Sequence, residues 1–168
     1  MLTIKNLTIS YTHKELSIIK DLSFELPKGS ICFLTGDSGS GKTTLCLAIA
    51  GLLLHARPEA NVLGLIEWNK KLIKQKDFNQ EIALTLENPY SQLTGLKHTV
   101  WEEIAFGLEM RGVSREEMER RIQIAVDIFG IAHLLSRHPR TLSGGETQKV
   151  VIASSYVLIP ELWILDRP

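Results

Sequence analysis

An eight-residue loop near the N-terminus constrains this chain more than any other feature. Residues 36–43 (GDSGSGKT) match the pattern G-x-x-x-x-G-K-[ST] at every fixed position. A short apolar run over residues 30–35 precedes the loop, and a helical pattern follows from about residue 42 to residue 54. This order predicts a phosphate-binding loop in an α/β domain, with residues 30–35 as a buried parallel strand.

The residue types of the loop fit the phosphates of a nucleotide. Glycines let the backbone approach closely, so the amides of residues 39–44 can point at phosphate oxygens, and the helix dipole adds positive potential. Lys42 would reach the β- and γ-phosphates, and the Thr43 hydroxyl would ligate Mg²⁺. The alternative is a glycine-rich turn that binds nothing, which the flanking strand and helix disfavour. The other candidate nucleotide contacts are Gly36, Asp37, Ser38, Gly39, Ser40, Gly41 and Thr44.

The remaining pattern predicts a mixed α/β domain. Residues 2–10 and 16–26 alternate as an antiparallel strand pair, and residues 62–68 and 81–86 predict further strands. Helical patterns cover residues 99–110, 114–129 and 144–158, the second with Ser114 and Glu117 as a capping box and Gly130 as its stop. A last strand covers residues 162–165. We therefore expect a single domain over residues 1–168, with a helical subdomain at about residues 90–142.

Composition excludes several classes of protein. The 168 residues carry 19 basic and 19 acidic side chains and are 44% hydrophobic, which is typical of one globular domain. A neutral chain has no bulk charge with which to recruit nucleic acid, and no apolar run approaches the length of a membrane span. The N-terminus lacks the apolar block of a signal peptide, so a cytoplasmic protein is expected. The two cysteines, Cys32 and Cys46, are predicted to be buried thiols. Four lysines are predicted to form a solvated basic cluster: Lys70, Lys71, Lys74 and Lys76.

A second motif lies about a hundred residues after the loop. Residues 142–148 (LSGGETQ) open the helix at 144–158, and Ser143 with Glu146 forms a capping-box pattern. Paired with the phosphate loop, this motif resembles the signature of the ATP-binding cassette (ABC) ATPases that drive membrane transporters. In that family the signature of one subunit closes over ATP held by the phosphate loop of another. The resemblance implies that five residues act across a dimer interface: Leu142, Ser143, Gly144, Gly145 and Glu146.

Three further segments carry the same resemblance. Tyr11 stands where the family places an aromatic residue that stacks on adenine, and residues 162–166 (LWILD) resemble the second nucleotide motif, whose Asp166 holds Mg²⁺ through water. Residues 88–92 (NPYSQ) and 99–109 resemble the energy-coupling-factor branch, whose ATPases power uptake of vitamins or of cobalt and nickel ions. The resemblance implies ATP and Mg²⁺ as cofactors. It also implies that the region from about residue 87 to residue 110 meets the coupling helices of a transmembrane partner.

The chain departs from the family pattern in its catalytic residues. Arg167 follows the Walker Asp where the family has a Glu that polarises the attacking water, and a guanidinium offers no lone pair for that task. Glu87 replaces the Gln that reaches the metal; a carboxylate could still ligate Mg²⁺, beside Thr43 and Asp166, but adds negative charge. These changes predict slow hydrolysis with ATP binding retained.

The sequence also stops at Pro168, before the family's dimer-contacting loop and switch histidine. None of the histidines follows the Walker Asp, so none matches that switch residue: His13, His55, His98, His133 and His138. In folds of this kind a strand after the Walker Asp inserts beside the phosphate-loop strand. Without it we expect marginal stability, dependence on a partner or rearranged strand pairing.

The favoured function is therefore the ATP-binding subunit of a membrane transporter. It would couple Mg-ATP binding and hydrolysis, at an interface with a second ABC ATPase subunit, to uptake through separate transmembrane subunits, on the inner face of the membrane. Two alternatives stay open. One is a non-hydrolysing ATP-binding fragment with an assembly or regulatory role. The other is a soluble ABC ATPase acting on DNA or ribosomes, against which the neutral charge argues.

Overall fold

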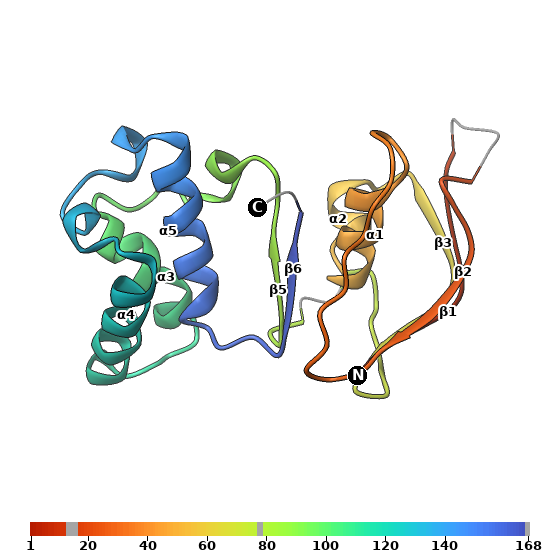
Figure 1. Ribbon diagram of the computed structural model, residues 1–168, viewed down its shortest axis with the longest axis horizontal. Helices are drawn as coiled ribbons and strands as arrows, with labels where there is room; N and C mark the ends of the chain where they lie inside the picture. Colours follow the sequence, from red (N-terminus) through yellow and green to blue (C-terminus); the bar gives the residue numbers. More distant parts are fainter. Residues whose placement is uncertain (13–16, 77–78, 167–168) are drawn as a thin grey trace. The chain divides into compact units, whose positions relative to one another are not determined.

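A computed structural model describes residues 1–12, 17–76 and 79–166. The chain divides into two compact units, Met1–Gln80 and Glu81–Pro168, and both combine helices with strands (Figure 1). The fold is therefore mixed α/β, as the sequence predicts. The phosphate loop belongs to the first unit, and the LSGGETQ motif and Asp166 belong to the second.

The first unit is built on an antiparallel sheet with the strand order β2-β1-β3-β4. Its strands are β1 (Leu2–Tyr11), β2 (Ile19–Leu26), β3 (Ala60–Trp68) and β4 (Lys71–Leu72). Ile4 pairs with Phe24 on β2 and with Ile66 on β3, so β1 is the central partner of both. The antiparallel pair predicted at the N-terminus is confirmed.

A bulge in this sheet explains one glycine. The pairing of β1 with β3 shifts between Lys5 and Thr8, opposite Gly64, whose φ is +95°. A Cβ at Gly64 would lie 2.4 Å from the carbonyl oxygen of Asn6. Only glycine accepts both this backbone conformation and this close approach of the two strands.

Two short helices lie on one side of this sheet (Figure 1): α1 (Lys42–Ile49) and α2 (Leu53–Ala56). Their apolar side chains Leu45, Ala48 and Leu53 are buried, as are Leu7 and Ile9 of β1. The prediction of a single helix over residues 42–54 is wrong, because two helices form there. Gly51, at φ +76°, interrupts it, because a left-handed residue cannot continue a right-handed helix.

The predicted strand at residues 30–35 is not formed. Ile31 and Phe33 are 84% and 86% exposed, and Cys32 is exposed as well, so only Cys46 of the two cysteines is buried as predicted. A parallel strand is held by hydrogen bonds to its neighbours, and no described strand pairs with this segment. Apolar side chains at residues 30–35 favour burial, but no strand of the described sheets forms the hydrogen bonds that would make this segment a strand.

The second unit contains a parallel pair of strands and three longer helices. The strands are β5 (Ile82–Thr85) and β6 (Leu162–Leu165), in register from Ile82 opposite Leu162 to Thr85 opposite Leu165. Between them the chain forms α3 (Val100–Met110), α4 (Arg115–Phe129) and α5 (Gly144–Tyr156), with the 3-10 turns η1 (Pro89–Gln92), η2 (Ala132–Leu134) and η3 (Pro139–Thr141). The strands β5 and β6 and these three helices are all close to their predicted bounds.

Local capping sets the bounds of these helices. Thr99 and Glu102 form a reciprocal capping box at the start of α3, and the Ser114 hydroxyl accepts a hydrogen bond from the Glu117 amide at the start of α4. Gly130, at φ +64°, ends α4 in the left-handed conformation. The Ser114 cap is confirmed, but the Glu117 side chain binds Arg120 and Arg121 instead of closing the box.

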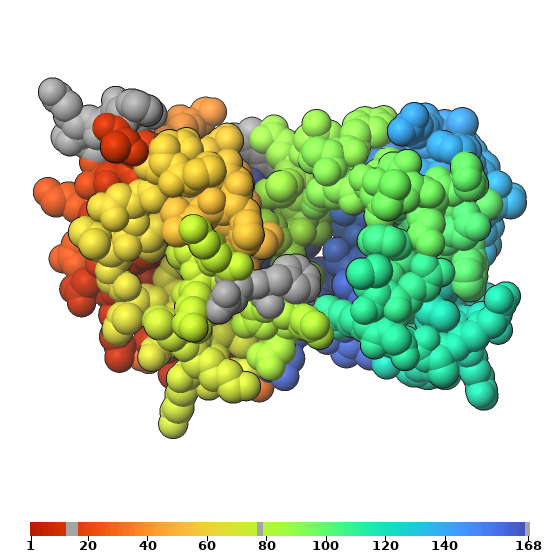
Figure 2. Space-filling model, turned by 180° about the vertical axis from the view of Figure 1, so that it is seen from behind, coloured from red at the N-terminus to blue at the C-terminus, as the bar shows by residue number. Residues whose placement is uncertain are grey.

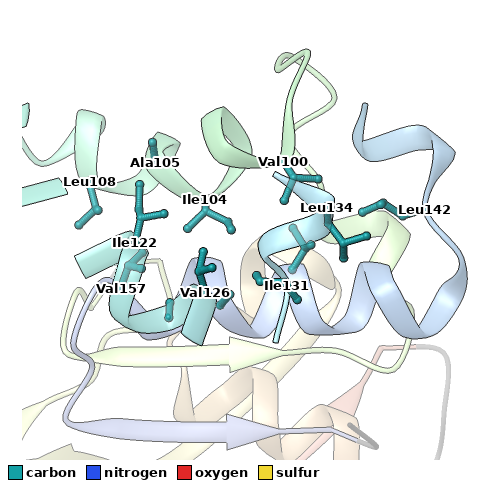
Figure 3. Close-up of a cluster of buried hydrophobic side chains, with 13 residues drawn as sticks. Val100, Ile104, Ala105, Leu108, Ile122, Val126, Ile131, Leu134, Leu142 and Val157 are labelled. Atoms are coloured by element: carbon teal, nitrogen blue, oxygen red, sulfur yellow. The ribbon is translucent and has the colours of Figure 1, made fainter. Parts of the chain in front are cut away.

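The helices of the second unit share one apolar core (Figure 3). Val100, Ile104 and Leu108 of α3 are fully buried, and Ile122 and Val126 of α4 are 1% and 2% exposed. Burying each such side chain contributes about 1.5–3 kcal/mol. This core holds the loop before α5, because Ile131, Leu134 and Leu142 also point into it.

The surface carries isolated apolar side chains and the predicted lysine cluster. Figure 2 shows a face of the second unit on which α3 and α4 lie at the surface. Met110 of α3 and Ile128 of α4 are 73% and 55% exposed. The four lysines of residues 70–76 are exposed. Among the described helices, none combines the length and the hydrophobicity that crossing a bilayer requires.

Candidate nucleotide-binding site

The phosphate loop is exposed and ends in a left-handed glycine. Gly41 caps the N-terminus of α1 at φ +94°, and a Cβ there would lie 2.7 Å from Cγ2 of Ile18. The Leu45 amide donates to the Gly41 carbonyl at 2.9 Å, which closes the first helical turn. The Ser40 amide donates to Asp37 at 3.2 Å and so turns the loop back on itself. Loop and helix thus leave exposed backbone where an anion can approach.

Lys42 lies folded across this loop. Its Nζ donates to the carbonyl oxygens of Gly36 at 2.7 Å and Asp37 at 2.6 Å, and to Oγ of Ser40 at 3.2 Å. These bonds fix a positive charge inside the loop, at the N-terminal end of α1. The role of Lys42 as the cation that meets the phosphates stays a prediction.

Tyr11 lies in the same unit and is bonded to the helix after the loop. Its hydroxyl shares a hydrogen bond of 3.1 Å with Oγ1 of Thr44, and Tyr11 is the last residue of β1. The structure therefore brings together the predicted adenine-stacking residue and the predicted phosphate contacts. A hollow of about 290 Å³ is lined by loop residues, among them Ser40 and Lys42, and on its apolar side by Ile18, Leu22 and Leu34.

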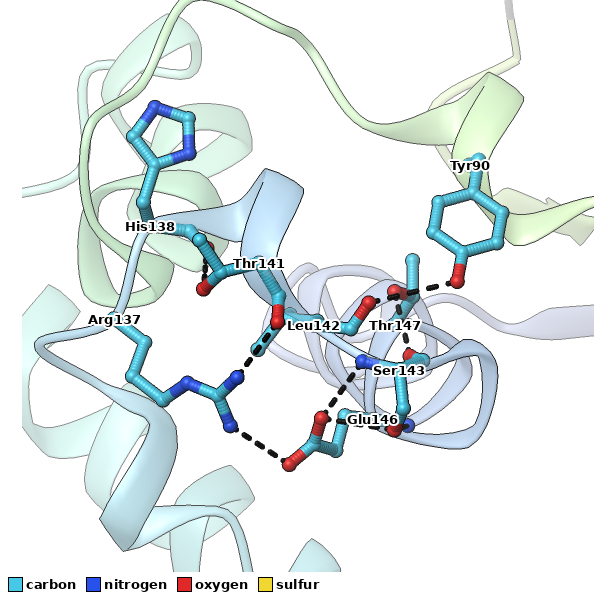
Figure 4. A network of polar contacts seen from close by, with 8 residues as sticks. All are labelled: Tyr90, Arg137, His138, Thr141, Leu142, Ser143, Glu146 and Thr147. Carbon is cyan, nitrogen blue, oxygen red and sulfur yellow. Dashed lines mark hydrogen bonds and ion pairs between the residues drawn. The ribbon is translucent and has the colours of Figure 1, made fainter.

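The LSGGETQ motif forms the start of α5 in the second unit (Figure 4). Oε2 of Glu146 accepts hydrogen bonds from the Ser143 amide at 2.7 Å and from the Ser143 hydroxyl at 2.8 Å, and Ser143 Oγ accepts from the Glu146 amide at 3.4 Å. The predicted capping box is confirmed. Ser143, Gly144 and Gly145 are exposed, while Leu142 is anchored in the core.

Arg137 is a contact of this motif that the sequence did not single out. Its Nη1 donates to Oε1 of Glu146 at 2.9 Å, and its Nη2 donates to the Thr141 carbonyl at 2.6 Å (Figure 4). Hydrogen bonds from Ser143 first, and then the Arg137 charge, lower the pKa of the Glu146 carboxyl. No motif places Arg137, which stands nine residues before Glu146, and the only signal is a basic side chain shortly before the signature.

Two predicted metal or catalytic residues follow the paired strands of the second unit. Asp166 is buried at the end of β6, and its amide donates to the Thr85 carbonyl of β5 at 2.8 Å. Glu87 follows β5 by two residues and is exposed. Both therefore leave the carboxyl ends of neighbouring parallel strands, the edge at which α/β sheets bind ligands. Arg167 lies outside the described residues.

The donor types suit Mg²⁺. The Thr43 hydroxyl and the carboxylates of Asp166 and Glu87 are hard oxygen ligands, which Mg²⁺ prefers. Thr43 belongs to the first unit and the two carboxylates to the second. Within the described ranges, no three His, Cys, Asp or Glu side chains gather into a metal-binding cluster.

Comparison with known proteins identifies the family of sequences to which these motifs belong. The profile of the ABC transporter family matches residues 19–168. A putative ABC transporter ATP-binding protein of Methanosarcina mazei is 36% identical over 99% of this chain and 34% of its own length. The energy-coupling factor transporter ATP-binding protein EcfA1 of Lactobacillus gasseri is 34% identical over 99% of this chain and 58% of its own length.

Solved structures share the fold. The cbiO1 protein of Clostridium perfringens, part of the ABC transporter complex cbiONQ, superposes with a TM-score of 0.81 at 24% identity, over 98% of this chain and 64% of that one. An ATP-binding subunit of an ABC transporter superposes at 0.79 with 28% identity, over 98% and 65%. The chain spans between 32% and 60% of the first three curated relatives. With its phosphate loop, signature and Walker Asp in place, the chain belongs to the ABC transporter family.

Proposed function

We propose that the chain is an ATP-binding subunit of an energy-coupling-factor type importer. The main support is the phosphate loop, whose carbonyl oxygens accept hydrogen bonds from Lys42. Tyr11 is hydrogen-bonded to Thr44 in the helix that follows the loop. Similarity to the EcfA1 proteins of Lactobacillus gasseri and Mycoplasmopsis pulmonis supports the branch. The other subunits would be a second ABC ATPase, identical or different, and transmembrane proteins that meet the region of residues 87–110 at the cytoplasmic face of the membrane.

Binding of ATP uses groups that the loop already presents. Of the three acceptors of Lys42, Ser40 Oγ is the most distant, at 3.2 Å. A phosphate oxygen carries more negative charge than a hydroxyl, so it displaces Ser40 while the bonds to Gly36 and Asp37 keep the ammonium in place. Thr43 and Asp166 would hold Mg²⁺, which neutralises phosphate charge when bound. Tyr11 offers its ring to the adenine.

The signature would act on the nucleotide of the second subunit. Ser143, Gly144 and Gly145 are exposed at the N-terminus of a 13-residue helix, whose dipole favours an anion there. The negative charge of Glu146 would oppose that anion, but Arg137 pairs with it. The start of α5 can therefore meet γ-phosphate oxygens without an unbalanced carboxylate beside them.

Hydrolysis at the chain's own site would be slow. A water molecule is positioned for attack on the γ-phosphate by a carboxylate in this family, and Arg167 supplies none. Glu87 adds charge where the family has an amide. The signature of this chain would then complete the site of a competent second subunit. These same two departures favour the second candidate, a non-hydrolysing ATP-binding subunit that assembles or regulates the transporter.

Calorimetry with Mg-ATP, ADP and a non-hydrolysable analogue tests the proposal. We expect binding by the wild type and its loss in Lys42→Ala, on material shown to be folded by circular dichroism. Absence of heat from all three nucleotides would refute the assignment. Mixing with a catalytically competent ABC subunit separates the two candidates, because only a chain with a working signature raises turnover.

A further inference from the structure

We propose that Arg137 is a positioning residue that links the start of α3 to the signature. One residue makes both connections. Its backbone carbonyl accepts a hydrogen bond of 3.0 Å from the Val100 amide, in the first turn of α3. Its guanidinium donates to Glu146 and to the Thr141 carbonyl, in the first turn of α5 and the loop before it (Figure 4).

The side-chain connection reaches the residue that would meet phosphate. Glu146 divides its carboxylate: Oε1 accepts from Arg137, and Oε2 accepts from the amide and hydroxyl of Ser143. Arg137 therefore orients Ser143 through Glu146. The rigid fork of a guanidinium suits this task, because its two Nη atoms reach a carboxylate and a carbonyl at once.

The backbone connection reaches the start of α3. Two adjacent amides of α3 find acceptors in the segment before the signature, Val100 at Arg137 and Trp101 at the Leu135 carbonyl, 3.0 Å each. The first amides of a helix have no partner within the helix, so these bonds replace partners that α3 cannot supply. A displacement of the first turn of α3 must move the backbone of Arg137 or break these bonds.

This inference rests on the proposed function, in which residues 87–110 meet the transmembrane partner. Docking of the partner on α3 would displace Arg137. Through the hydrogen bonds of Glu146 it would then change the position of Ser143. The side chains of Arg137 and Glu146 are 39% and 28% exposed, so water screens their pair only in part. An ion pair of this kind with an added charged hydrogen bond is worth about a tenfold change in an equilibrium.

Arg137→Met tests the side-chain connection, and Arg120→Met is its control. Arg120 makes an ion pair of 2.7 Å with Glu117, and both residues lie on α4. In Arg137→Met we expect unchanged affinity of the chain's own loop for Mg-ATP by calorimetry. We expect the Ser143 amide to exchange about tenfold faster by NMR, and Mg-ATP-driven self-association to weaken about tenfold in sedimentation. Equal behaviour of the two variants would overturn the inference.

A second pair of variants tests the connection itself. Thr99→Ala removes the cap of α3, and Ser114→Ala removes the cap of α4 as the control. We expect Thr99→Ala to speed Ser143 exchange in the wild type but to add nothing in the Arg137→Met background. Additive effects would overturn the link. Failure of the wild type to self-associate with Mg-ATP would refute a dimer of identical chains, and the exchange cycle would still decide the role of Arg137.

Discussion

The hydroxyl of Tyr11 shares a 3.1 Å hydrogen bond with Oγ1 of Thr44, which ties the end of β1 to the helix that follows the phosphate loop. The two residues stand 33 positions apart. The bond orients the Tyr11 ring relative to the loop before any nucleotide arrives. Preorganisation of this kind lowers the entropy lost on binding.

This bond separates two contributions of Tyr11 to ATP affinity. Tyr11→Ala removes ring and bond, and we expect at least tenfold weaker binding of Mg-ATP, because stacking on a base is worth about 1–3 kcal/mol. Tyr11→Phe keeps the ring and should lose only a fewfold. Thr44→Val removes the same bond from the other side and should match Tyr11→Phe. Calorimetry measures all three, and an unchanged affinity in Tyr11→Ala would exclude stacking.

Gly144→Asp should block the signature while leaving the fold intact. A Cβ at Gly144 would meet only the Tyr90 hydroxyl, at 3.8 Å, so the folded chain has room for it. A carboxylate there would face the phosphates of the second subunit's nucleotide, and like charges across an interface cost several kcal/mol. We expect Mg-ATP-driven association to fall about a hundredfold or more, with own-site affinity unchanged. Gly144→Ala, with the same backbone and no charge, serves as the control; equal losses in both would point to sterics.

Arg167→Glu should raise turnover. The substitution places a carboxylate after Asp166, where a group that positions and polarises water typically contributes about 10²–10⁴-fold. Phosphate release from the purified chain, or from its mixture with a competent subunit, measures the gain. Arg167→Gln removes the positive charge without supplying a base and should gain far less. A rate that stays flat in Arg167→Glu would place the barrier elsewhere, Glu87 being the next position to restore.

The free energy of unfolding of the second unit should fall in acid, because Glu117 becomes protonated. Hydrogen bonds from Arg120 and then Arg121 lower the pKa of the Glu117 carboxyl from 4.5 to about 2. Because the folded pKa is the lower one, the stabilisation is fully present above about pH 4.5 and is lost as the pH falls toward 2.

Urea titrations between about pH 6 and about pH 2.5 check the effect. Glu117→Gln should flatten the fall of the free energy of unfolding with decreasing pH. Glu119→Gln removes a carboxylate whose side chain is 53% exposed and should leave the slope nearly as in the wild type. A wild-type slope in Glu117→Gln would show that other carboxylates carry the acid sensitivity.

Helix bounds and the phosphate loop were predictable because their causes are local. Ser114, Gly130 and Ser143 act on backbone groups within a few residues, so a short stretch of sequence contains both the cap and its target. The strand pair at the N-terminus followed from alternation of apolar side chains. Lys42 and Gly41 also followed from a motif whose geometry lies within one loop.

Residues 30–35 show where local pattern fails. Six residues rich in apolar side chains satisfy the description of a buried strand, yet Ile31 and Phe33 are exposed. Strand formation depends on hydrogen bonds to another segment, and this dependence is invisible in the segment's own sequence. The break at Gly51 is a smaller case, since the helical pattern continued across it.

By itself the sequence determined the family, the loop that would bind phosphate, the caps at Ser114, Gly130 and Ser143, and the substitutions at Glu87 and Arg167. Tertiary structure alone decided that Tyr11 bonds to Thr44 and that Arg137 joins the start of α3 to Glu146. A sequence motif consists of residues that lie in one turn of the backbone or at a fixed spacing along the chain. Contacts between distant segments arise only when apolar burial brings those segments together, so their residues carry no common pattern along the chain.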